Sequence, residues 1–259
     1  MSNPSDTPRI LALVPCAGSG SRAGTAMPKQ YQPVAGRAML WHALVAFAQA
    51  PSVDASLLVL APGLTESDEH RQWLREAGFI ARGTVGWCSA VLDLTQDAAT
   101  LRKRLASTWR TQLNGAERGG LEFEISDKPC AFDWMLARHQ ENMRDKGFAG
   151  TSPDFLRALR ERAPEDVFVC RALHDGQPLA GMIVFRFARS AEYFVGWFGP
   201  EARQKKAGNF LMWNAALTMQ ARGCERFDLG GYSSSDGYGR FKQGLRGSEY
   251  RLLEEWVAF

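Results

Sequence analysis

The sequence contains few of the residues from which disulfide frameworks and metal centres are built. Its five cysteines are odd in number, widely spaced and never arranged as Cys-x-x-Cys, and its four histidines form no cluster with ligand spacing. These absences argue against a disulfide-stapled secreted domain and against a structural zinc site, so we predict no metal ligand. Isolated cysteines are typical of a reducing compartment, and we expect a cytoplasmic protein.

An excess of charge of one sign is also missing. The 31 basic and 28 acidic residues give a net charge of +3, which is too balanced for a DNA-binding surface or for an anionic membrane surface. No apolar run approaches the ~20 residues that a bilayer span needs. The apolar run that begins at Ile10 is broken by Pro15 and is too short for a secretory signal. We therefore expect no DNA partner and no stable membrane span, and the oligomeric state stays open.

What is present is enough apolar sequence for a core and enough length for two domains, with 45% hydrophobic residues among 259. Short aliphatic runs at 10–14 and 56–60 predict buried strands, and helical spacing predicts a helix over 39–50 between them. Strand, helix and strand in this order form a right-handed βαβ unit. Because so small a sheet has unpaired edges, we expect it to join the rest of the chain in one composite sheet.

The remaining sequence predicts further strands and helices in mixed order. A basic helix capped by Thr95 is expected to run as far as the glycines at 119 and 120. A strand pair joined by the turn HDGQ is predicted at 167–187. Other expected elements are strands at 89–94, 121–125, 192–198 and 226–229, and helices at 66–76, 132–146, 153–163 and 210–222.

A glycine-rich loop follows the first predicted strand, in the segment ALVPCAGSGSRAGTAMPKQY. Glycines let backbone N–H groups converge on phosphate oxygens, and the start of a helix adds its positive dipole end. Arg22 and Lys29 follow the loop and could neutralise a triphosphate. On these residues alone, an ordinary strand-to-helix turn with exposed basic residues is the favoured interpretation.

The longer segment PCAGSGSRAGTAMPKQYQPVAGRAML resembles the N-terminal signature of 2-C-methyl-D-erythritol 4-phosphate cytidylyltransferases, over about Pro8 to Leu64. The resemblance implies CTP with magnesium, with Arg22 and Lys29 on the phosphates. Backbone contacts would come from Ala17, Gly18, Ser19 and Gly20. Segments like the family's later ones, which hold metal, base and sugar phosphate, are not found after Leu64. We therefore expect a vestigial phosphate site, because positioning groups are missing.

The second half carries another resemblance. The segment GNFLMWNAALTMQARGCERFDLGGYSSSDGYGRFKQGLRGSEYRLLEEW resembles Fem-type peptidoglycan bridge-forming enzymes, a branch of the GCN5-related N-acyltransferases. The likeness runs from about Gly83 to Phe259. It implies a mixed sheet in which two strands splay apart beside the donor. It also implies a donor that is either a coenzyme A thioester or an aminoacyl-tRNA.

The same resemblance implies roles for particular residues. Lys242 is expected to stabilise the donor's ester carbonyl or an adjacent phosphate. Asp228 is interpreted either as a general base for the amine or as a structural acid, and the structural role is favoured. The other candidate substrate-binding residues are Arg203, Lys205 and Lys206 before a helix, Gly230 and Gly231 after a strand, and Tyr238 and Arg240 on the following loop. A solvated basic turn is an equally good interpretation of the first three.

Taken together, the sequence predicts an α/β fold with a GCN5-related mixed sheet and an N-terminal Rossmann-like βαβ unit. The predicted domains are 1–64, nucleotidyltransferase-like, and 65–259, Fem-like. The favoured function is N-acyl transfer to an amine, of a small molecule or a cell-wall precursor, with tRNA as a further candidate partner. A cytidylyltransferase and a catalytically silent chimera or scaffold are the alternatives.

Overall fold

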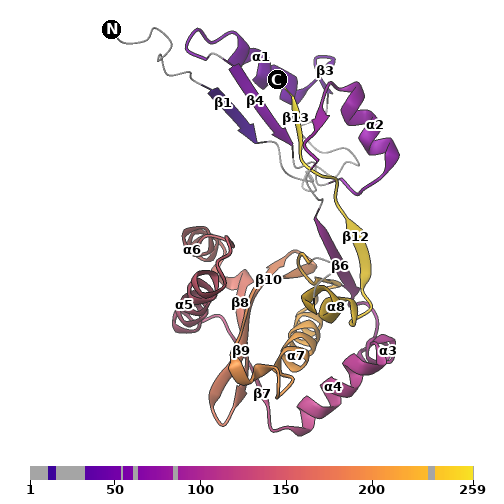
Figure 1. Ribbon diagram of the computed structural model, residues 1–259, viewed down its shortest axis with the longest axis vertical. Helices are drawn as coiled ribbons and strands as arrows, with labels where there is room; N and C mark the ends of the chain where they lie inside the picture. The colour runs from indigo at the N-terminus through magenta and orange to yellow at the C-terminus, as the bar shows by residue number, and fades with distance from the viewer. Residues whose placement is uncertain are drawn as a thin grey trace. The chain divides into compact units, whose positions relative to one another are not determined.

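The computed structural model describes residues 11–15, 33–53, 55–60, 64–83, 87–232 and 237–258. The glycine-loop residues at 17–20, together with Arg22 and Lys29, lie outside these ranges. The chain forms two compact units, Met1–Cys88 with Tyr250–Phe259, and Ser89–Glu249, and their elements are labelled in Figure 1. The predicted boundary between the domains 1–64 and 65–259 was placed where the cytidylyltransferase resemblance was expected to end, and it stays a prediction.

The first unit contains the predicted parallel strand pair. Strand β1 (Leu11–Pro15) pairs in parallel with β4 (Ala55–Leu60), and helix α1 (Met39–Ala48) lies between them in the sequence. Before α1, β2 (Pro33–Val34) and β3 (Arg37–Ala38) form a hairpin. The strand–helix–strand order was therefore predicted correctly, and the proposed Rossmann-like character rests on this one parallel pair.

The sheet of the first unit is completed by the end of the chain. Its strand order is β1-β4-β13-β5, with β13 (Trp256–Ala258) antiparallel both to β4 and to β5 (Ile80–Ala81). Helix α2 (Asp68–Glu76) is capped by Ser67, whose hydroxyl accepts from the His70 N–H. Leu40, Leu74, Leu253 and Trp256 form the core. Strands β1 and β4 of the predicted N-terminal unit thus share a sheet with β5 and β13, which come from the predicted second region, as a composite sheet requires. Among the described strands, those of the second unit form a separate sheet.

The second unit is built on a seven-stranded mixed sheet of order β12-β6-β11-β10-β9-β8-β7. Strands β10 and β11 are parallel, and the ladders from β7 to β10 and from β11 to β6 are antiparallel. This sheet confirms the predicted fold class. Its strands are β6 (Cys88–Asp93), β7 (Glu122–Ser126), β8 (Val167–His174), β9 (Gln177–Phe187), β10 (Ser190–Phe198), β11 (Arg226–Asp228) and β12 (Ser248–Arg251).

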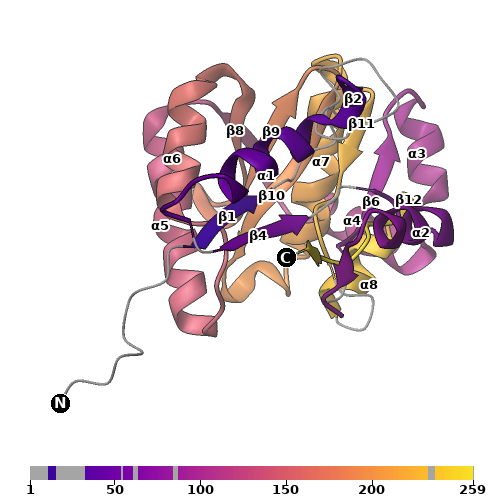
Figure 2. The same ribbon diagram turned by 90° about the horizontal axis from the view of Figure 1, so that it is seen from above.

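Helices cover both faces of this sheet, as Figures 1 and 2 show. On one face, α7 (Ala207–Ala221) packs with α3 (Ala98–Arg104) and α4 (Ser107–Arg118) over buried side chains such as Met182 and Val184. On the other face, α5 (Pro129–Lys146) and α6 (Pro153–Arg162) pack over Ile183 and Phe185. Consecutive β9 residues thus alternate between two cores, as the pleat of a strand requires. Short 3-10 turns lie at Pro164–Asp166 and Pro200–Ala202.

Two local predictions differ from the structure. The single basic helix is two helices, α3 and α4, and the first is capped by Asp97 instead of Thr95. The break occurs because the Ala106 N–H donates to the Gly244 carbonyl oxygen at 2.9 Å, a contact with a distant segment. The loop predicted to carry Tyr238 and Arg240 contains a further helix, α8 (Gly237–Gln243).

Candidate active site

The centre of the candidate site is the place where β10 and β11 part. Their parallel ladder runs from the Ser190–Arg226 pair to the Glu192–Asp228 pair, while β10 continues to Phe198. Beyond Glu192 the ladder with β11 therefore stops, and no strand among the described residues is in register with β10 on that side. A register shift between Tyr193 and Val195 interrupts the opposite ladder, against β9, at the same place. This is the splayed strand pair that the acyltransferase resemblance led us to expect.

The two glycines after β11 allow a close approach of the backbone. Gly230 has a φ of +69°, and a Cβ atom built on it would lie 2.4 Å from the carbonyl oxygen of Tyr193. Only glycine fits such a position, because a side chain would overlap the backbone of β10. Gly230 was predicted to bind substrate, and in the structure it lies against the protein's own strand β10.

Lys242 lies on the inner face of α8 and is 1% exposed. Its Nζ atom donates to the carbonyl oxygens of Gly230 and Gly231, at 2.9 Å each. The rings of Tyr238 and Tyr193 lie 4.4 and 4.8 Å from the same nitrogen, close enough for cation–π attraction. The Tyr238 hydroxyl also donates to that of Tyr193 at 2.6 Å. The structure thus brings Lys242, Gly230, Gly231 and Tyr238 together.

Asp228 joins this group from the end of β11. Its Oδ1 atom accepts from the Gly230 N–H at 2.8 Å and from the buried hydroxyl of Ser89 at 2.5 Å. The same hydroxyl lies 2.9 Å from the Gly230 carbonyl oxygen. These contacts are those of an acid that holds the loop after β11, which was the favoured interpretation of Asp228; a catalytic role stays untested.

Glu192, which the sequence analysis did not single out, is the second acid of the site. It pairs in register with Asp228 where the two strands part. Burial and, to a smaller extent, the nearby Asp228 carboxylate raise the pKa of Glu192 to about 7, although the Lys242 ammonium group opposes the shift. A carboxyl group with this pKa changes its charge near neutral pH and can take up a proton there. The only signal in the sequence was a charged residue inside an otherwise apolar strand.

The three basic residues before α7 lie at its N-terminal end, as predicted. Lys206 is the cap residue, with a φ of 55° and no side-chain cap hydrogen bond, and Arg203 is exposed in the preceding turn. The Lys205 side chain is fixed by a contact with His174, since its Nζ atom lies 3.0 Å from the Nε2 atom of that residue. A Cβ atom on Gly208 would lie 3.7 Å from the ring of Phe241, which places the start of α7 beside α8.

Arg240 lies on α8 but not with Lys242. The Arg240 side chain is exposed and lines a cavity on the opposite side of the helix.

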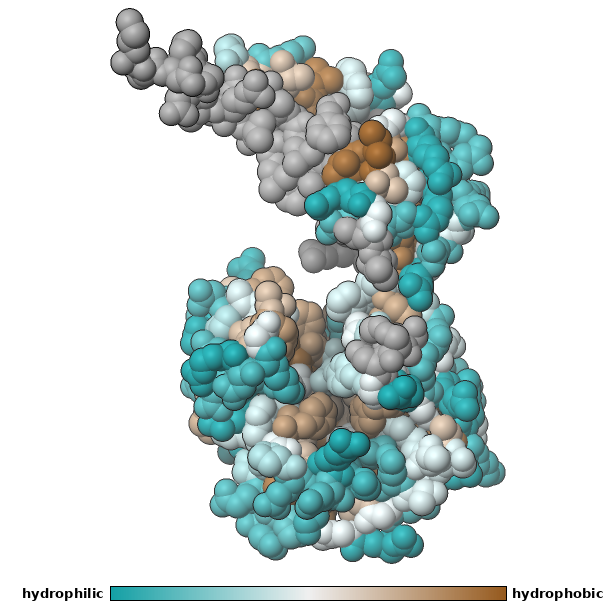
Figure 3. All heavy atoms as spheres, in the orientation of Figure 1, coloured by the Kyte–Doolittle hydropathy of each residue, from teal (hydrophilic) through white to brown (hydrophobic). Residues whose placement is uncertain are grey.

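Figure 3 shows apolar residues, in brown, gathered beside the polar outer surface of α5 and α6 on this unit. Within the described ranges, no group of three or more His, Cys, Asp or Glu residues could hold a metal ion, and no helix has the length and apolar character to cross a membrane.

A mixed sheet whose two parallel strands part beside buried glycines is the architecture of a GCN5-related acyltransferase. Residues 102–243, more than half of the chain, match the family described as "Acetyltransferase (GNAT) domain". The chain therefore belongs to this family.

Solved structures agree with that assignment at the level of the fold. FemX is similar with a TM-score of 0.67 and 11% identity, over 85% of this chain and 75% of that chain. The C-terminal domain of a putative lysylphosphatidylglycerol synthetase from Agrobacterium fabrum is similar with a TM-score of 0.56 and 18% identity, over 84% of this chain and 72% of that chain. The predicted Fem-like architecture is thus confirmed.

The N-terminal segment matches a different family. Residues 10–84 match 2-C-methyl-D-erythritol 4-phosphate cytidylyltransferase, so this similarity extends beyond Leu64, where it was predicted to end. The enzyme of that name from Cupriavidus pinatubonensis is 63% identical over 54 residues, which are 21% of this chain and 22% of the relative. That from Burkholderia multivorans is 36% identical over 160 residues, 62% of this chain and 54% of the relative. The chain thus spans at most about half the length of these two relatives. An acetyltransferase-family match and a cytidylyltransferase match within one chain are the pattern of a fusion of the two.

Proposed function

We propose that the protein transfers an acyl or aminoacyl group from a coenzyme A thioester or an aminoacyl-tRNA to a primary amine. The observation that carries the proposal is the parting of β10 and β11 beside Glu192 and the buried Lys242. Membership of the acetyltransferase family supports acyl transfer in general. The likeness to a protein named as a lysylphosphatidylglycerol synthetase favours an aminoacyl donor, and a small-molecule or cell-wall amine is the proposed acceptor.

In the proposed reaction, the amine lone pair attacks the donor's carbonyl carbon. A C–N bond forms as the C–S or C–O bond breaks, and the proton lost by the amine passes to the Glu192 carboxylate. The departing thiolate or alkoxide takes up a proton in turn. Lys242 acts as a positioning residue, because its contacts with the Gly230 and Gly231 carbonyls fix the backbone along which the donor would lie. The three basic residues before α7 would meet the donor's phosphates, aided by the helix dipole.

The rate of acyl transfer is expected to rise with pH through about 7, as Glu192 loses its proton. Glu192→Gln should remove this rise and lower kcat by about 10²-fold or more, the usual contribution of a general base. Asp228→Asn is the matched control, since its amide oxygen can still accept from Ser89 and from the Gly230 N–H. If Asp228→Asn abolishes the rise and Glu192→Gln does not, Asp228 is the base and our assignment of Glu192 is wrong.

The same variant has a readout that needs no substrate. The folded-state pKa of Glu192, about 7, lies above the ordinary value of 4.5. Between these two values the unfolded chain has already released this proton while the folded protein retains it, so rising pH favours unfolding. We expect the wild type to lose stability over that range and Glu192→Gln to lose less. Urea unfolding at several pH values measures this difference; equal slopes in the two proteins would contradict the raised pKa.

A cytidylyltransferase function is the second candidate, favoured by the 63% identity over the first segment. If that segment binds the triphosphate of CTP, the double variant Arg22→Ala with Lys29→Ala should show no CTP binding in a calorimetric titration with magnesium. CTP affinity that survives both changes would show that the loop is not the site. If neither CTP nor either acyl donor binds, the third alternative, a silent scaffold, is the remaining interpretation.

A further inference from the structure

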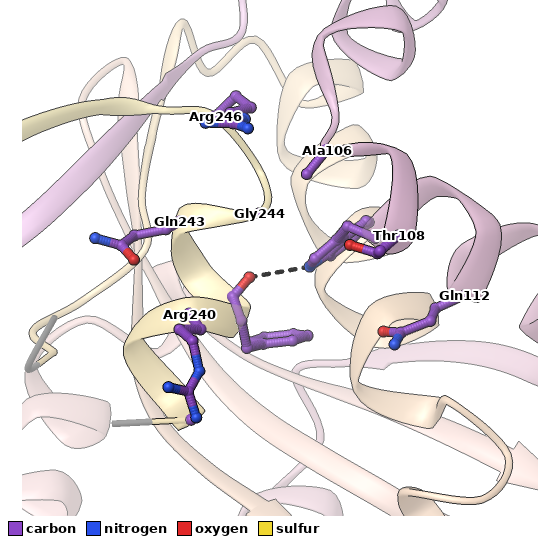
Figure 4. Close-up of a pocket in the computed structure, with 10 residues that line it drawn as sticks. Ala106, Thr108, Gln112, Arg240, Gln243, Gly244 and Arg246 are labelled. Carbon is purple, nitrogen blue, oxygen red and sulfur yellow. Dashed lines mark hydrogen bonds between the residues drawn. The ribbon is translucent and has the colours of Figure 1, made fainter. Parts of the chain in front are cut away.

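The second unit contains a cavity of about 440 Å³ between the start of α4 and the outer side of α8 (Figure 4). Figure 4 shows Thr108 and Gln112 of α4 on one side and Arg240 and Gln243 of α8 on the other. A cavity of this size is within the range of small-ligand sites. The lining residues are Ala106, Thr108, Trp109, Gln112, Gly237, Arg240, Phe241, Gln243, Gly244 and Arg246.

The charge of this lining has one sign. Arg240 and Arg246 contribute two guanidinium groups, and no carboxylate is among the described residues that line the cavity. Thr108, Gln112 and Gln243 add neutral hydrogen-bonding groups. Guanidinium groups donate two parallel hydrogen bonds to phosphate oxygens, which makes arginine the usual residue at phosphate sites. The composition therefore points to an anionic ligand.

The backbone supports the same choice of ligand. Helix α4 begins at the cavity, and its cap residue Ala106 has no side chain that could accept from the first-turn N–H groups. Those groups and the positive end of the helix dipole add to the attraction that the arginines exert on an anion.

The aromatic part of the wall is rigid and reaches the candidate active site. The indole Nε1 of Trp109 donates to the Phe241 carbonyl oxygen at 3.0 Å. The Phe241 ring is stacked with Tyr238, whose own ring lies 4.4 Å from the Lys242 Nζ atom. Helix α8 thus presents Lys242 to the parting strands and Arg240 to the cavity. A ligand in the cavity would lie against the helix that positions Lys242.

We propose that this cavity binds the phosphate groups of a nucleotide-sized ligand. The volume admits more than a single phosphate ion, the two arginines match phosphate charge, and the amide side chains can hydrogen-bond a sugar or base. The proposal does not depend on acyl transfer, because it concerns binding alone. A free nucleoside diphosphate, coenzyme A and the nucleotide end of an RNA share this chemistry, and binding experiments distinguish these sources.

The test is a calorimetric titration of the full chain carrying Arg22→Ala and Lys29→Ala, together with Arg203→Gln, Lys205→Gln and Lys206→Gln, which removes the charges of the two other candidate phosphate sites. The probes are ADP, coenzyme A and a short single-stranded RNA ending in CCA. In this background, Arg240→Gln with Arg246→Gln should weaken binding by about tenfold, as expected for the loss of two exposed charge-assisted contacts. The control is Arg118→Gln, an exposed arginine in the last turn of α4 that does not line the cavity.

The indole N–H signal of Trp109 in a ¹⁵N NMR spectrum gives a second readout, localised to the cavity wall. It should shift on addition of the probe that binds, and the double arginine variant should need about tenfold more probe for the same shift. The probe with the tightest arginine-dependent binding identifies the source of the phosphate. If no probe binds, or if the double variant binds each probe as the control does, the proposal is overturned.

Discussion

Gly230→Ala is expected to destabilise the protein by about 2–5 kcal/mol, the largest effect we predict for a single methyl group. Part of the cost is the left-handed backbone, with a φ of +69°, which an alanine adopts at about 1–2 kcal/mol. The rest is overlap, because the new Cβ atom would lie 2.4 Å from the Tyr193 carbonyl oxygen. A backbone atom in a sheet cannot move aside as a side-chain end can, so overpacking costs about 1–3 kcal/mol more. Thermal and urea unfolding measure the loss.

Gly176→Ala is the matched control for this change. Gly176 has a φ of +72°, but nothing lies within 4 Å of its added Cβ atom. It therefore carries the backbone cost alone, about 1–2 kcal/mol. The difference between the two variants isolates the close approach of β10 to the loop after β11. Equal destabilisation in both would show that the strands do not meet as described.

Lys242→Met is expected to lower kcat for acyl transfer by about 10²-fold or more and to reduce stability by about 2 kcal/mol. Methionine keeps most of the volume, but the carbonyl oxygens of Gly230 and Gly231 lose the ammonium donor that each has at 2.9 Å. The backbone between the parting strands then loses its fixed position. Steady-state kinetics with the donor that binds and urea unfolding measure the two effects separately.

Two further variants separate positioning from general stability. Lys242→Arg keeps a cation with several donors and should recover part of kcat. Lys146→Met removes an exposed lysine from the last turn of α5 and should change neither quantity. If Lys242→Met loses stability but keeps kcat, Lys242 serves the fold alone and has no part in the reaction.

Much of the second unit could be predicted from the sequence because its elements are long and their patterns are local. The strand predicted at 192–198 is β10 (Ser190–Phe198), and the helix predicted at 210–222 is α7 (Ala207–Ala221). The boundary errors are small because glycine and proline punctuate these segments. The break between α3 and α4 could not be predicted, since it depends on a backbone hydrogen bond between Ala106 and Gly244, residues far apart in the chain.

The candidate site was predicted in part for the same reason. The resemblance around RFKQG singled out Lys242, and the structure places it against the two predicted glycines. Glu192 could not be found, because its importance comes from its register with Asp228, which only the folded sheet reveals. Arg246 was missed because its position in the wall of the same cavity as Arg240 depends on the turn that follows α8.

The position of β13 has a consequence for how the chain is made. Residues 256–258 fill the place between β4 and β5, so the first unit receives an inner strand from a segment translated long after its other strands. Its early strands must wait, with an open edge, while the intervening 161 residues from Ser89 to Glu249 emerge. Domains generally fold in the order of their synthesis. Here the first unit cannot complete its sheet until the second has been translated, so chaperones that shield strand edges would be needed most by the earlier strands β1, β4 and β5.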